Sequence, residues 1–520
     1  MPKTIAAKDR NRMSLATEAE LGSKGRERAQ ATLAETLPGV RFLVALLLPL
    51  AAIKAAQLFV APPTADEAYY WLWGQHLDWS YYDHPPLAAW LERLSGELFG
   101  WNLFALRAPV LLTFTGSLWT LWFWARRLAG RDLALRAFLG GAVAWLAMPM
   151  LMRFQSLAHQ DHLLIFFGLL TAHFWALFYQ GLEGRRRPWR YFHAGCVALG
   201  LAALSKYNAV FLGLGFAFWV VISPKGRPLL ATRHLWLGAA VALIMQAPVI
   251  GWNIAHDWPS FTYNLQGRIG QSVHGGFGGN LQDFLLSSVL MLSPIAGLAL
   301  YRFAIGAGTV KTPFEPAGRW VLIGSTAVFV ALCASNTILH YWNLAAYLFA
   351  LPVLVFYMRG RAEFAFHGLF GIAMGVWLVL AQVIYPSHRL FGSELRDVDI
   401  SFGLDQIAAI VAEEEAFIGV DMVMTTDYRT ASLLSFAGKR LDVVKIGLRD
   451  DQFDIWFDPA AHKGKDALVL VDDFLPEQEL VTHVFERVTP IREFTVERFG
   501  VPVHTYRLVL AENYSGQGPH

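Results

Sequence analysis

Charged residues are scarce in this sequence. Asp, Glu, Lys and Arg make up 16% of its 520 residues, whereas 55% are hydrophobic. A soluble domain of this length needs many more charged side chains to cover its surface, so the composition excludes an ordinary soluble protein. The net charge of +2 is close to neutral. It therefore also argues against a protein that binds nucleic acid or another polyanion.

Cysteine is nearly absent as well. Cys196 and Cys333 each lie inside an apolar run, so they form neither a disulfide framework nor a CxxC metal site. Residues 1–38 lack the apolar segment of a signal peptide, and their polar, mixed-charge composition predicts a disordered or loosely helical cytoplasmic tail. The glycine-rich stretch 274–280 lacks the flanking strand and helix of a nucleotide-binding loop.

Long apolar runs, by contrast, are abundant. Runs of about 17–25 apolar residues are typical of helices that cross a bilayer, and we predict about eleven of them. They lie near 40–61, 104–127, 133–152, 162–182, 190–205, 208–223, 234–252, 282–303, 319–336, 342–358 and 364–385. The sequence therefore predicts an α-helical polytopic membrane protein whose transmembrane domain covers residues 39–390.

Basic residues gather in alternate loops. Lys and Arg are concentrated near 126–136, 185–190, 225–233, 302–319 and 359–361. The positive-inside rule places these loops and the N-terminus in the cytoplasm. The polar segments that remain then lie on the external side, at 62–103, 155–161, 205–208, 253–281 and 335–341. Separate segments that supply polar groups to one face indicate a site.

The composition changes near residue 390. Residues 395–512 contain no membrane-spanning run, but apolar clusters of strand length alternate with helical patterns. The strand-like clusters are Phe417–Met424, Leu441–Ile446, Ala467–Val471 and His504–Leu510. We predict a small α/β domain that an odd number of spans would place outside the cytoplasm. Because the motifs described below all precede residue 350, we expect this domain to be dispensable for chemistry.

Two adjacent carboxylates, Asp66 and Glu67, open the first external loop. Carboxylates are costly to desolvate at a membrane surface, so the pair indicates a general base, a metal ligand or an organiser of an acceptor. The alternative is a solvated turn within an interfacial aromatic belt. Further along this loop, apolar residues at helical spacing predict an amphipathic helix over 87–98 that lies on the membrane surface.

A third acid, Asp161, lies between His159 and His162 at the external mouth of the fourth predicted span. It is either a second functional acid or simply the N-cap of that helix. The two histidines and the aspartate could also bind a metal, although their spacing matches no fixed metal-ligand pattern.

Cationic candidates are few. Lys206 stands between two apolar runs at the external surface, where it either binds a lipid phosphate or snorkels to the interface. Arg268, in the 253–281 loop, is a second phosphate candidate with weaker support. Lys54 lies well inside the first predicted span, so it either snorkels outward or faces a polar cavity.

Several short motifs resemble a known family. They are DEAYYW at 66–71, YYDHPP at 81–86, QD at 160–161, GLAALSKY at 200–207 and HYWNLAAY at 340–347. In this order they resemble the GT-C membrane glycosyltransferases of the protein-mannosyltransferase and aminoarabinose-transferase type. The resemblance covers most of the chain, and a pendant external α/β domain fits the bacterial members.

The resemblance implies roles for individual residues. Asp66 corresponds to the essential acid of the first external loop, a catalytic base or acceptor organiser, with Glu67 as its neighbour in the catalytic group. Asp161 corresponds to the second acid. Lys206 corresponds to the lysine near the donor phosphate, and Arg268 joins it as a further phosphate candidate.

The motif before the double proline departs from the aminoarabinose transferases. Asp83–His84 stands where they carry Glu–Lys. His84 then takes the phosphate-binding position, where a neutral histidine is a poorer partner than lysine near pH 7. This departure argues against aminoarabinose as the sugar and lipid A as the acceptor. The same motifs contribute supporting residues, namely Asp83, Tyr69, Tyr82 and His340.

The function implied is that of an inverting glycosyltransferase in the cell inner membrane. It would move a hexosyl or pentosyl group from a polyprenyl-phosphate donor to lipid A, the lipopolysaccharide core, another glycolipid or a protein, on the external face. No cofactor is required by this chemistry, although a divalent cation is left open, and no nucleic-acid partner is expected. The alternative is a polytopic transporter or flippase for a lipid or solute, but such proteins usually place ionisable groups near mid-membrane.

Overall fold

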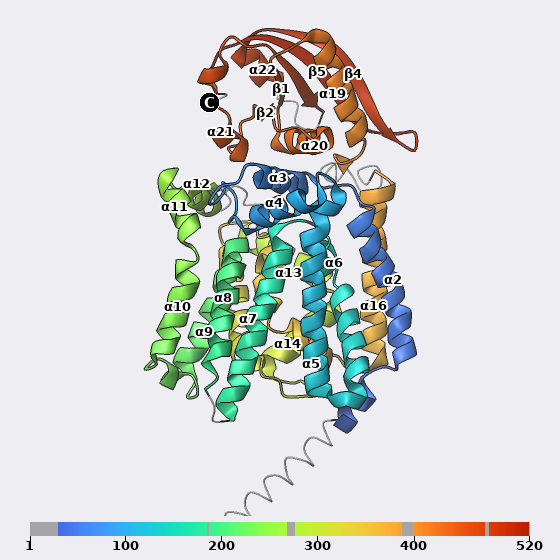
Figure 1. The fold of residues 1–520 in the computed structure, drawn as a ribbon. Helices are drawn as coiled ribbons and strands as arrows, with labels where there is room; N and C mark the ends of the chain where they lie inside the picture. Colours follow the sequence, from blue (N-terminus) through green and yellow to red (C-terminus); the bar gives the residue numbers. More distant parts are fainter. Residues whose placement is uncertain (1–29, 185–186, 268–275, 387–398, 474–477, 519–520) are drawn as a thin grey trace, which may run out of the picture.

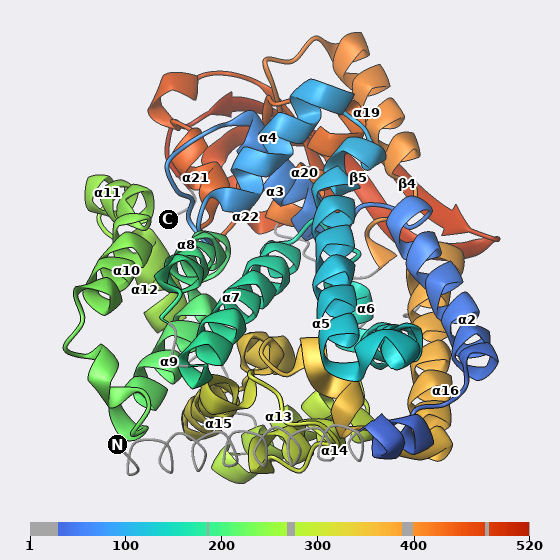
Figure 2. The same cartoon turned by 60° about the horizontal axis from the view of Figure 1, so that its bottom comes forward.

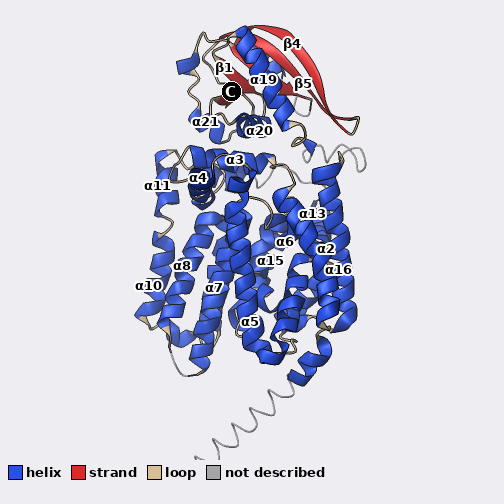
Figure 3. Cartoon of the chain, turned by 45° about the vertical axis from the view of Figure 1, so that its right-hand side comes forward, coloured by secondary structure: helices blue, strands red, loops and turns tan. Residues whose placement is uncertain are grey.

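The computed structural model describes all residues except 1–29, 185–186, 268–275, 387–398, 474–477 and 519–520. Its larger part is a bundle of helices, and its smaller part is an α/β domain stacked on one end of that bundle (Figure 1). Two short helices, α3 (Ala65–Gln75) and α4 (Leu87–Phe99), lie between the two parts. Strands occur in the α/β domain only, within the described residues (Figure 3).

The helices of the bundle follow the apolar runs of the sequence. They are α2 (Val40–Phe59), α5 (Leu103–Leu146), α6 (Pro149–Phe154), α7 (Gln160–Glu183), α8 (Trp189–Ser205), α9 (Val210–Ile222), α10 (Arg233–Ile244), α11 (Ala247–Ala255), α12 (Pro259–Thr262), α13 (Gly276–Leu292), α14 (Pro294–Ile305), α15 (Glu315–Leu332) and α16 (Gly360–Val379). The first and last of these, α2 and α16, lie side by side at one edge of the bundle (Figure 2).

Length and composition identify membrane-spanning candidates among the described residues. Four helices qualify, namely Val40–Phe59, Leu103–Leu146, Gln160–Glu183 and Gly360–Ile384. The number rises to six if α10 with α11, bent by 42°, and α13 with α14, bent by 100°, each form one span. These helices support a membrane protein, and the number of about eleven spans stays a prediction.

Three of the predicted runs are not simple α-helices. α5 contains two helices separated at Gly130, whose φ of 76° is outside the helical range, so the runs 104–127 and 133–152 are distinct, and the second run continues into α6. The run 342–358 forms η4 (His340–Tyr347) and η5 (Leu351–Tyr357), which are 3₁₀ helices. Every residue of η5 is buried. Irregular backbone is tolerated at membrane depth when protein surrounds it, so this apolar run is core rather than lipid-facing surface.

The described end of the predicted N-terminal tail is helical, which is one of the two alternatives that the composition left open. Residues 30–36 are helical, and Leu33 and Leu37 are buried in the main core of the bundle. Arg136 donates hydrogen bonds to the carbonyl oxygens of Ala34, Leu37 and Pro38, so it binds the end of this helix. Residues 1–29 lie outside the described part of the chain.

The α/β domain contains one five-stranded sheet with the order β2-β1-β3-β5-β4. Its strands are β1 (Met422–Thr425), β2 (Val443–Lys445), β3 (Ala467–Asp472), β4 (Phe485–Arg498) and β5 (Val501–Tyr514). The first three are parallel, and β5 pairs antiparallel with both β3 and β4. Its helices are α19 (Leu404–Ile418), α20 (Tyr428–Gly438), α21 (Gln452–Trp456) and α22 (Gln478–Val484).

The prediction of an α/β domain is confirmed, with one strand missed. β4 is mostly exposed along its length, so its sequence carries no apolar alternation. The first predicted strand begins too early, because α19 continues to Ile418 before β1 starts at Met422.

The α/β domain is fixed to α3, α4 and the loop between them. The hydroxyl of Tyr69 accepts a hydrogen bond from Gln452 N at 2.8 Å, and Gln452 Oε1 accepts one from Tyr82 N at 2.8 Å. Trp101 Nε1 donates to Phe436 O at 2.9 Å. The amphipathic helix predicted over 87–98 is present as α4. The layer that carries Asp66 is therefore held between the bundle and the α/β domain (Figure 1).

The orientation of the chain can be tested with reporter fusions after His520. We expect alkaline phosphatase to be active there, because basic loops place the opposite end of the bundle in the cytoplasm. Green fluorescent protein at the same position should stay dark. A fluorescent fusion without phosphatase activity would put the α/β domain in the cytoplasm and contradict the predicted topology.

Candidate active site

The site begins at the N-terminus of α3. Thr64 caps this helix, since its hydroxyl accepts from Glu67 N at 3.3 Å while Glu67 Oε2 accepts from Thr64 N at 2.9 Å. This reciprocal capping fixes where the helix starts. It places Asp66 and Glu67 in the first turn, where the helix dipole favours negative charge.

Glu67 forms a buried ion pair with Arg107 of α5. Arg107 Nε donates to Oε1 at 2.9 Å and a terminal nitrogen of Arg107 donates to Oε2 at 2.8 Å, and neither side chain is exposed by more than 1%. Oε1 also accepts from Ala158 N at 2.9 Å. Burial alone would raise the pKa of Glu67, but the charge and hydrogen bonds of Arg107, with help from His159 and Ala158 N, lower it to about 2. Each carboxylate oxygen of Glu67 thus already accepts two hydrogen bonds.

Asp66 is in a different situation although it is the next residue. Its side chain is half-buried, and Oδ1 accepts a hydrogen bond from the hydroxyl of Tyr428 at 3.2 Å. Burial and the negative charge of Asp66 raise the pKa of Tyr428, so this hydroxyl stays protonated and acts as the donor. Asp66 therefore keeps an accessible carboxylate at the junction between the bundle and the α/β domain.

Asp161 and Lys206 form a second buried ion pair, with 2.7 Å between Lys206 Nζ and Asp161 Oδ1. Asp161 lies in the first turn of α7, and the N-cap of that helix is His159, so the capping interpretation of Asp161 is wrong. Lys206 follows α8 directly and also lies over the ring of Tyr341, 5.0 Å from its centroid. The sequence singled out both residues, and the structure brings them into contact.

His159, the N-cap of α7, contacts Thr64, the N-cap of α3. Its Nε2 lies 3.3 Å from Thr64 Oγ1. Burial lowers the pKa of His159, while the negative charges of Asp66, Glu67 and Asp161 oppose that shift. His159 therefore lies among all three predicted catalytic acids.

Arg153 is a component that the sequence analysis missed. It lies in the last turn of α6 and is half-buried. Within the described part of the chain its guanidinium takes part in no hydrogen bond or ion pair. It interacts electrostatically with Glu67, Asp66 and Tyr341. Arg153 ends an apolar run and directly precedes the polar segment 155–161, so its position beside that segment was the one signal that could have identified it.

His340 faces the same region. Burial, together with the positive charge of Arg153, lowers the pKa of His340 to about 4. The imidazole is therefore neutral near pH 7, where it can donate or accept a hydrogen bond but carries no charge.

The YYDHPP motif lies on the other side of α3, against the α/β domain. Asp83 is buried, with Oδ1 3.8 Å from the guanidinium of Arg449, and its carbonyl accepts from Asn264 at 3.1 Å. Arg449 lies over the ring of Tyr428 at 4.2 Å. His84 is buried, with its ring 6.0 Å from that of Tyr70. This motif thus contacts the α/β domain, which carries Tyr428 and hence touches Asp66.

Three further candidates from the sequence remain to be compared with the structure. Lys54 is buried and donates to Met152 O at 3.4 Å, so it does not snorkel outward. Arg268 lies outside the described residues. No group of three or more His, Cys, Asp or Glu side chains that could hold a metal ion occurs within the described ranges.

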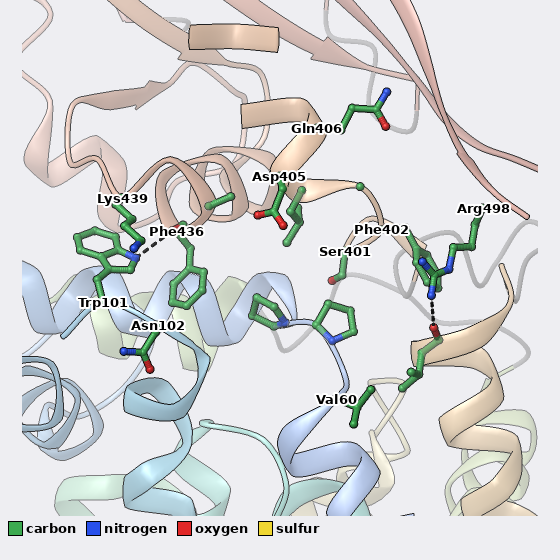
Figure 4. Close-up of a pocket in the computed structure, with 16 residues that line it drawn as sticks. Val60, Trp101, Asn102, Ser401, Phe402, Asp405, Gln406, Phe436, Lys439 and Arg498 are labelled. Atoms are coloured by element: carbon green, nitrogen blue, oxygen red, sulfur yellow. Dashed lines mark hydrogen bonds between the residues drawn. The ribbon is translucent and has the colours of Figure 1, made fainter. Parts of the chain in front are cut away.

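A cavity of about 590 Å³ lies between the end of the bundle and the α/β domain (Figure 4). Its walls come from Val60, Pro62 and Pro63, from the α4–α5 loop, and from α19 and α20. None of the residues that line it was singled out from the sequence.

Comparison with known proteins supports the resemblance. Residues 83–252 match the family described as dolichyl-phosphate-mannose-protein mannosyltransferase. The chain is 31% identical over 193 residues to the lipid A galacturonosyltransferase RgtD of Rhizobium johnstonii, a match that covers 37% of this chain and 38% of that relative. The matched segment thus spans less than half the length of the curated relative.

Solved structures show the fold. The structure of ArnT from Cupriavidus metallidurans bound to undecaprenyl phosphate has a TM-score of 0.60 at 18% identity and covers 93% of this chain and 100% of ArnT. The apo structure of the same protein has a TM-score of 0.57 at 16% identity and covers 90% of this chain and 97% of ArnT. The family model, the curated relative and the shared fold together confirm the resemblance of this chain to the GT-C membrane glycosyltransferases.

Proposed function

We propose that this protein transfers a sugar from a polyprenyl-phosphate donor to an envelope acceptor on the external face of the inner membrane. The observation that carries the proposal is the state of its three acids. Glu67 and Asp161 are each held in a buried ion pair, while Asp66 keeps an accessible carboxylate. A site that neutralises two acids and leaves a third open suits a general base.

Asp66 is assigned the role of catalytic base or acceptor organiser. It takes the proton of the acceptor hydroxyl while that oxygen attacks the anomeric carbon. The bond from this carbon to the phosphate oxygen breaks with inversion, and polyprenyl phosphate leaves. Glu67 is assigned a positioning role, because the hydrogen bonds from Arg107, Thr64 N and Ala158 N leave it no lone pair aimed at substrate.

Arg153 and Lys206 are assigned to the donor phosphate. A departing phosphate needs charge stabilisation more than a proton, and a guanidinium presents paired donors that match phosphate oxygens. Arg153 supports this role because its guanidinium has no hydrogen bond or ion pair within the described residues. Lys206 is already paired with Asp161, so it contributes through that pair. Asp161 then fixes the position of the lysine.

The comparisons suggest the substrates. RgtD is named as a lipid A galacturonosyltransferase, and ArnT was crystallised with undecaprenyl phosphate. We therefore propose an undecaprenyl-type donor and a lipid A-type glycolipid acceptor for this chain. The expectation from Asp83–His84, which argued against lipid A, gives way here because it rested on one motif position that lies against the α/β domain.

Substitutions of the two neighbouring acids are expected to have different effects, on turnover for Asp66 and on stability for Glu67. Asp66→Asn should lower turnover by at least about 10²-fold, the lower range for loss of a general base. Its thermal stability should be unchanged, because Asn keeps the size and the acceptor for Tyr428. Glu67→Gln should instead lower the stability by about 3–5 kcal/mol, because it leaves the buried Arg107 without its counter-charge.

Turnover and thermal unfolding in detergent measure both effects side by side. A stable but inactive Glu67→Gln variant, with an active Asp66→Asn variant, would reverse the two roles. If both variants kept full turnover, the proposed function itself would be wrong.

Arg153→Gln should weaken use of the donor. A charge-assisted hydrogen bond contributes about 1.5–3 kcal/mol, so kcat/KM for the polyprenyl-phosphate sugar should fall roughly ten- to a hundred-fold. The KM for the acceptor should stay the same. Arg131→Gln, at an exposed arginine of α5 directly after Gly130, is the matched control and should behave as wild type. An Arg153→Gln variant with unchanged donor kinetics would remove this residue from the phosphate site.

The contact between Tyr428 of the α/β domain and Asp66 can be tested by removing the tyrosine hydroxyl. Tyr428→Phe should lower turnover about two- to tenfold, because the hydroxyl donates one long hydrogen bond, at 3.2 Å, to the Asp66 carboxylate. Tyr514→Phe removes a hydroxyl from the far side of the same sheet and should leave turnover unchanged. Equal turnover in both variants would restore the expectation that the α/β domain is dispensable for chemistry.

A further inference from the structure

The hairpin formed by β4 and β5 ends in an apolar tip. Its strands pair as far as Arg498 and Val501, so Phe499 and Gly500 form a two-residue turn. Such turns usually contain Asn-Gly or Asp-Gly, because the central residues need a positive φ. Here the first position is Phe499, with φ at 53°, and its side chain is 70% exposed. A bulky residue in the left-handed region is strained, and strained positions concentrate at functional sites.

The tip is carried on an arm that extends beyond the sheet. β5 pairs with β4 from Val501 to Tyr514, but it pairs with β3 only over residues 506–511. Among the described residues, the end of the hairpin at 495–505 is therefore a ribbon of two strands. Ribbons of this kind are only marginally stable in water. Figures 1 and 3 show the arm reaching toward the end of α16, so contacts outside the sheet are needed to hold it.

The arm meets the bundle where the last membrane-spanning helix ends. α16 continues into η6 (Leu380–Ile384), and together they have 25 residues. At 1.5 Å per residue this length is about 37 Å, whereas the hydrocarbon core is about 30 Å thick, so the end of the helix reaches the headgroup layer. Arg498 donates to Val383 O at 3.1 Å (Figure 4). Phe499, the next residue, is thus held near the same level.

The bundle exposes apolar side chains at this level too. Phe59 and Val60, at the end of α2, are exposed by 56% and 62%, and Ile384 is exposed by 41%. α2 and α16 pack against each other (Figure 2), so these side chains belong to neighbouring ends of the bundle. Apolar side chains at the ends of spanning helices face lipid. Phe499 adds an aromatic ring to this apolar level from the α/β domain.

The tip has the chemistry of a segment that lies at a membrane interface. The guanidinium of Arg498 is 4.9 Å from the centroid of the Phe499 ring. A long cationic side chain can keep its charge among lipid headgroups while the aromatic ring beside it enters the apolar layer. In water, by contrast, the turn would expose a bulky ring at a position that asparagine fits with less strain.

We propose that the tip of the β4–β5 hairpin inserts into the headgroup region of the bilayer, with Phe499 as its anchor. The inference goes beyond the proposed function and does not depend on it, because no sugar or acceptor takes part. The α/β domain is then held at two places, by its hydrogen bonds to the α3–α4 layer and by the lipid surface. Because Tyr428 of this domain contacts Asp66, the lipid contact also steadies one side of the candidate site.

The experiment measures the depth of a nitroxide spin label on the full chain in nanodiscs of phosphatidylethanolamine and phosphatidylglycerol. The two native cysteines, Cys196 and Cys333, are buried and are replaced by alanine, so that one introduced cysteine takes the label. Oxygen concentrates in lipid and the nickel complex NiEDDA stays in water. A label at Phe499→Cys should collide with oxygen in preference to NiEDDA, as a label at the lipid-facing Phe59→Cys does.

Phe417→Cys is the matched control. Phe417 is 86% exposed, and it lies near the end of α19 that points away from the bundle (Figure 1). A label there should be accessible to NiEDDA. It compares two exposed phenylalanines of the same domain, of which only one lies at the level of the membrane.

A second variant tests the side chain of Phe499 itself. The label is placed at Glu497→Cys, on the same arm, with and without Phe499→Asn. Asparagine tolerates the left-handed region, so the thermal stability of Phe499→Asn should not fall. The ratio of inserted to free arm should fall roughly tenfold, since one buried phenylalanine side chain contributes at least about that factor. The label should then become accessible to NiEDDA, whereas Phe417→Asn should leave it unchanged.

Three results would overturn the proposal. A label at position 499 that is as accessible to NiEDDA as the label at 417 would place the tip in water. Protection from both reagents would show that protein, and not lipid, covers it. An unchanged label at 497 in the Phe499→Asn variant would remove Phe499 as the anchor. Sugar transfer is not measured, so these results are independent of those that test the proposed function.

Discussion

The buried ion pair between Glu67 and Arg107 is the constraint on which the site depends. Two desolvated charges are stable only when their remaining hydrogen-bonding capacity is satisfied. Here Arg107 also donates to the carbonyl oxygens of Gln57, Ala61 and Pro62, and Glu67 accepts from Ala158 N. The pair thus joins the end of α2, the start of α3, α5 and the segment before α7. Any movement of α3 would expose a charge to an apolar surrounding.

That rigidity explains why adjacent acids have different environments. Successive residues of an α-helix point about 100° apart, so fixing Glu67 toward Arg107 turns Asp66 toward the α/β domain. Asp161 is neutralised by Lys206 in the same way. Asp66 and Arg153 are then the two groups of opposite charge near the centre that no ion pair neutralises within the described residues. A sugar phosphate with an incoming hydroxyl is complementary to that arrangement.

The sequence predicted the helical bundle and the α/β domain because both depend on local periodicity. It also singled out Asp66 and Glu67 as candidates, because this pair of acids comes soon after an apolar run. It could not separate Asp66 from Glu67, since the distinction depends on Arg107, forty residues later. The contact of Tyr428 with Asp66 could not be predicted for the same reason, because the two residues are 362 positions apart in the sequence. The 3₁₀ geometry of 342–358 follows from burial among neighbouring helices, which hydropathy does not measure.

The position of Tyr428 brings the α/β domain into contact with the candidate site. This residue follows the carboxyl end of β1, and Arg449 follows the carboxyl end of β2. The carboxyl edge of a parallel sheet is where open α/β folds place their ligands. Here that edge lies on α3, with Tyr428 bonded to Asp66 and Arg449 next to Asp83. A domain docked in this way contacts the acid from one side and leaves its carboxylate half-buried. It also forms one wall of the cavity between the bundle and the domain, so the same docking builds both the surroundings of Asp66 and that cavity.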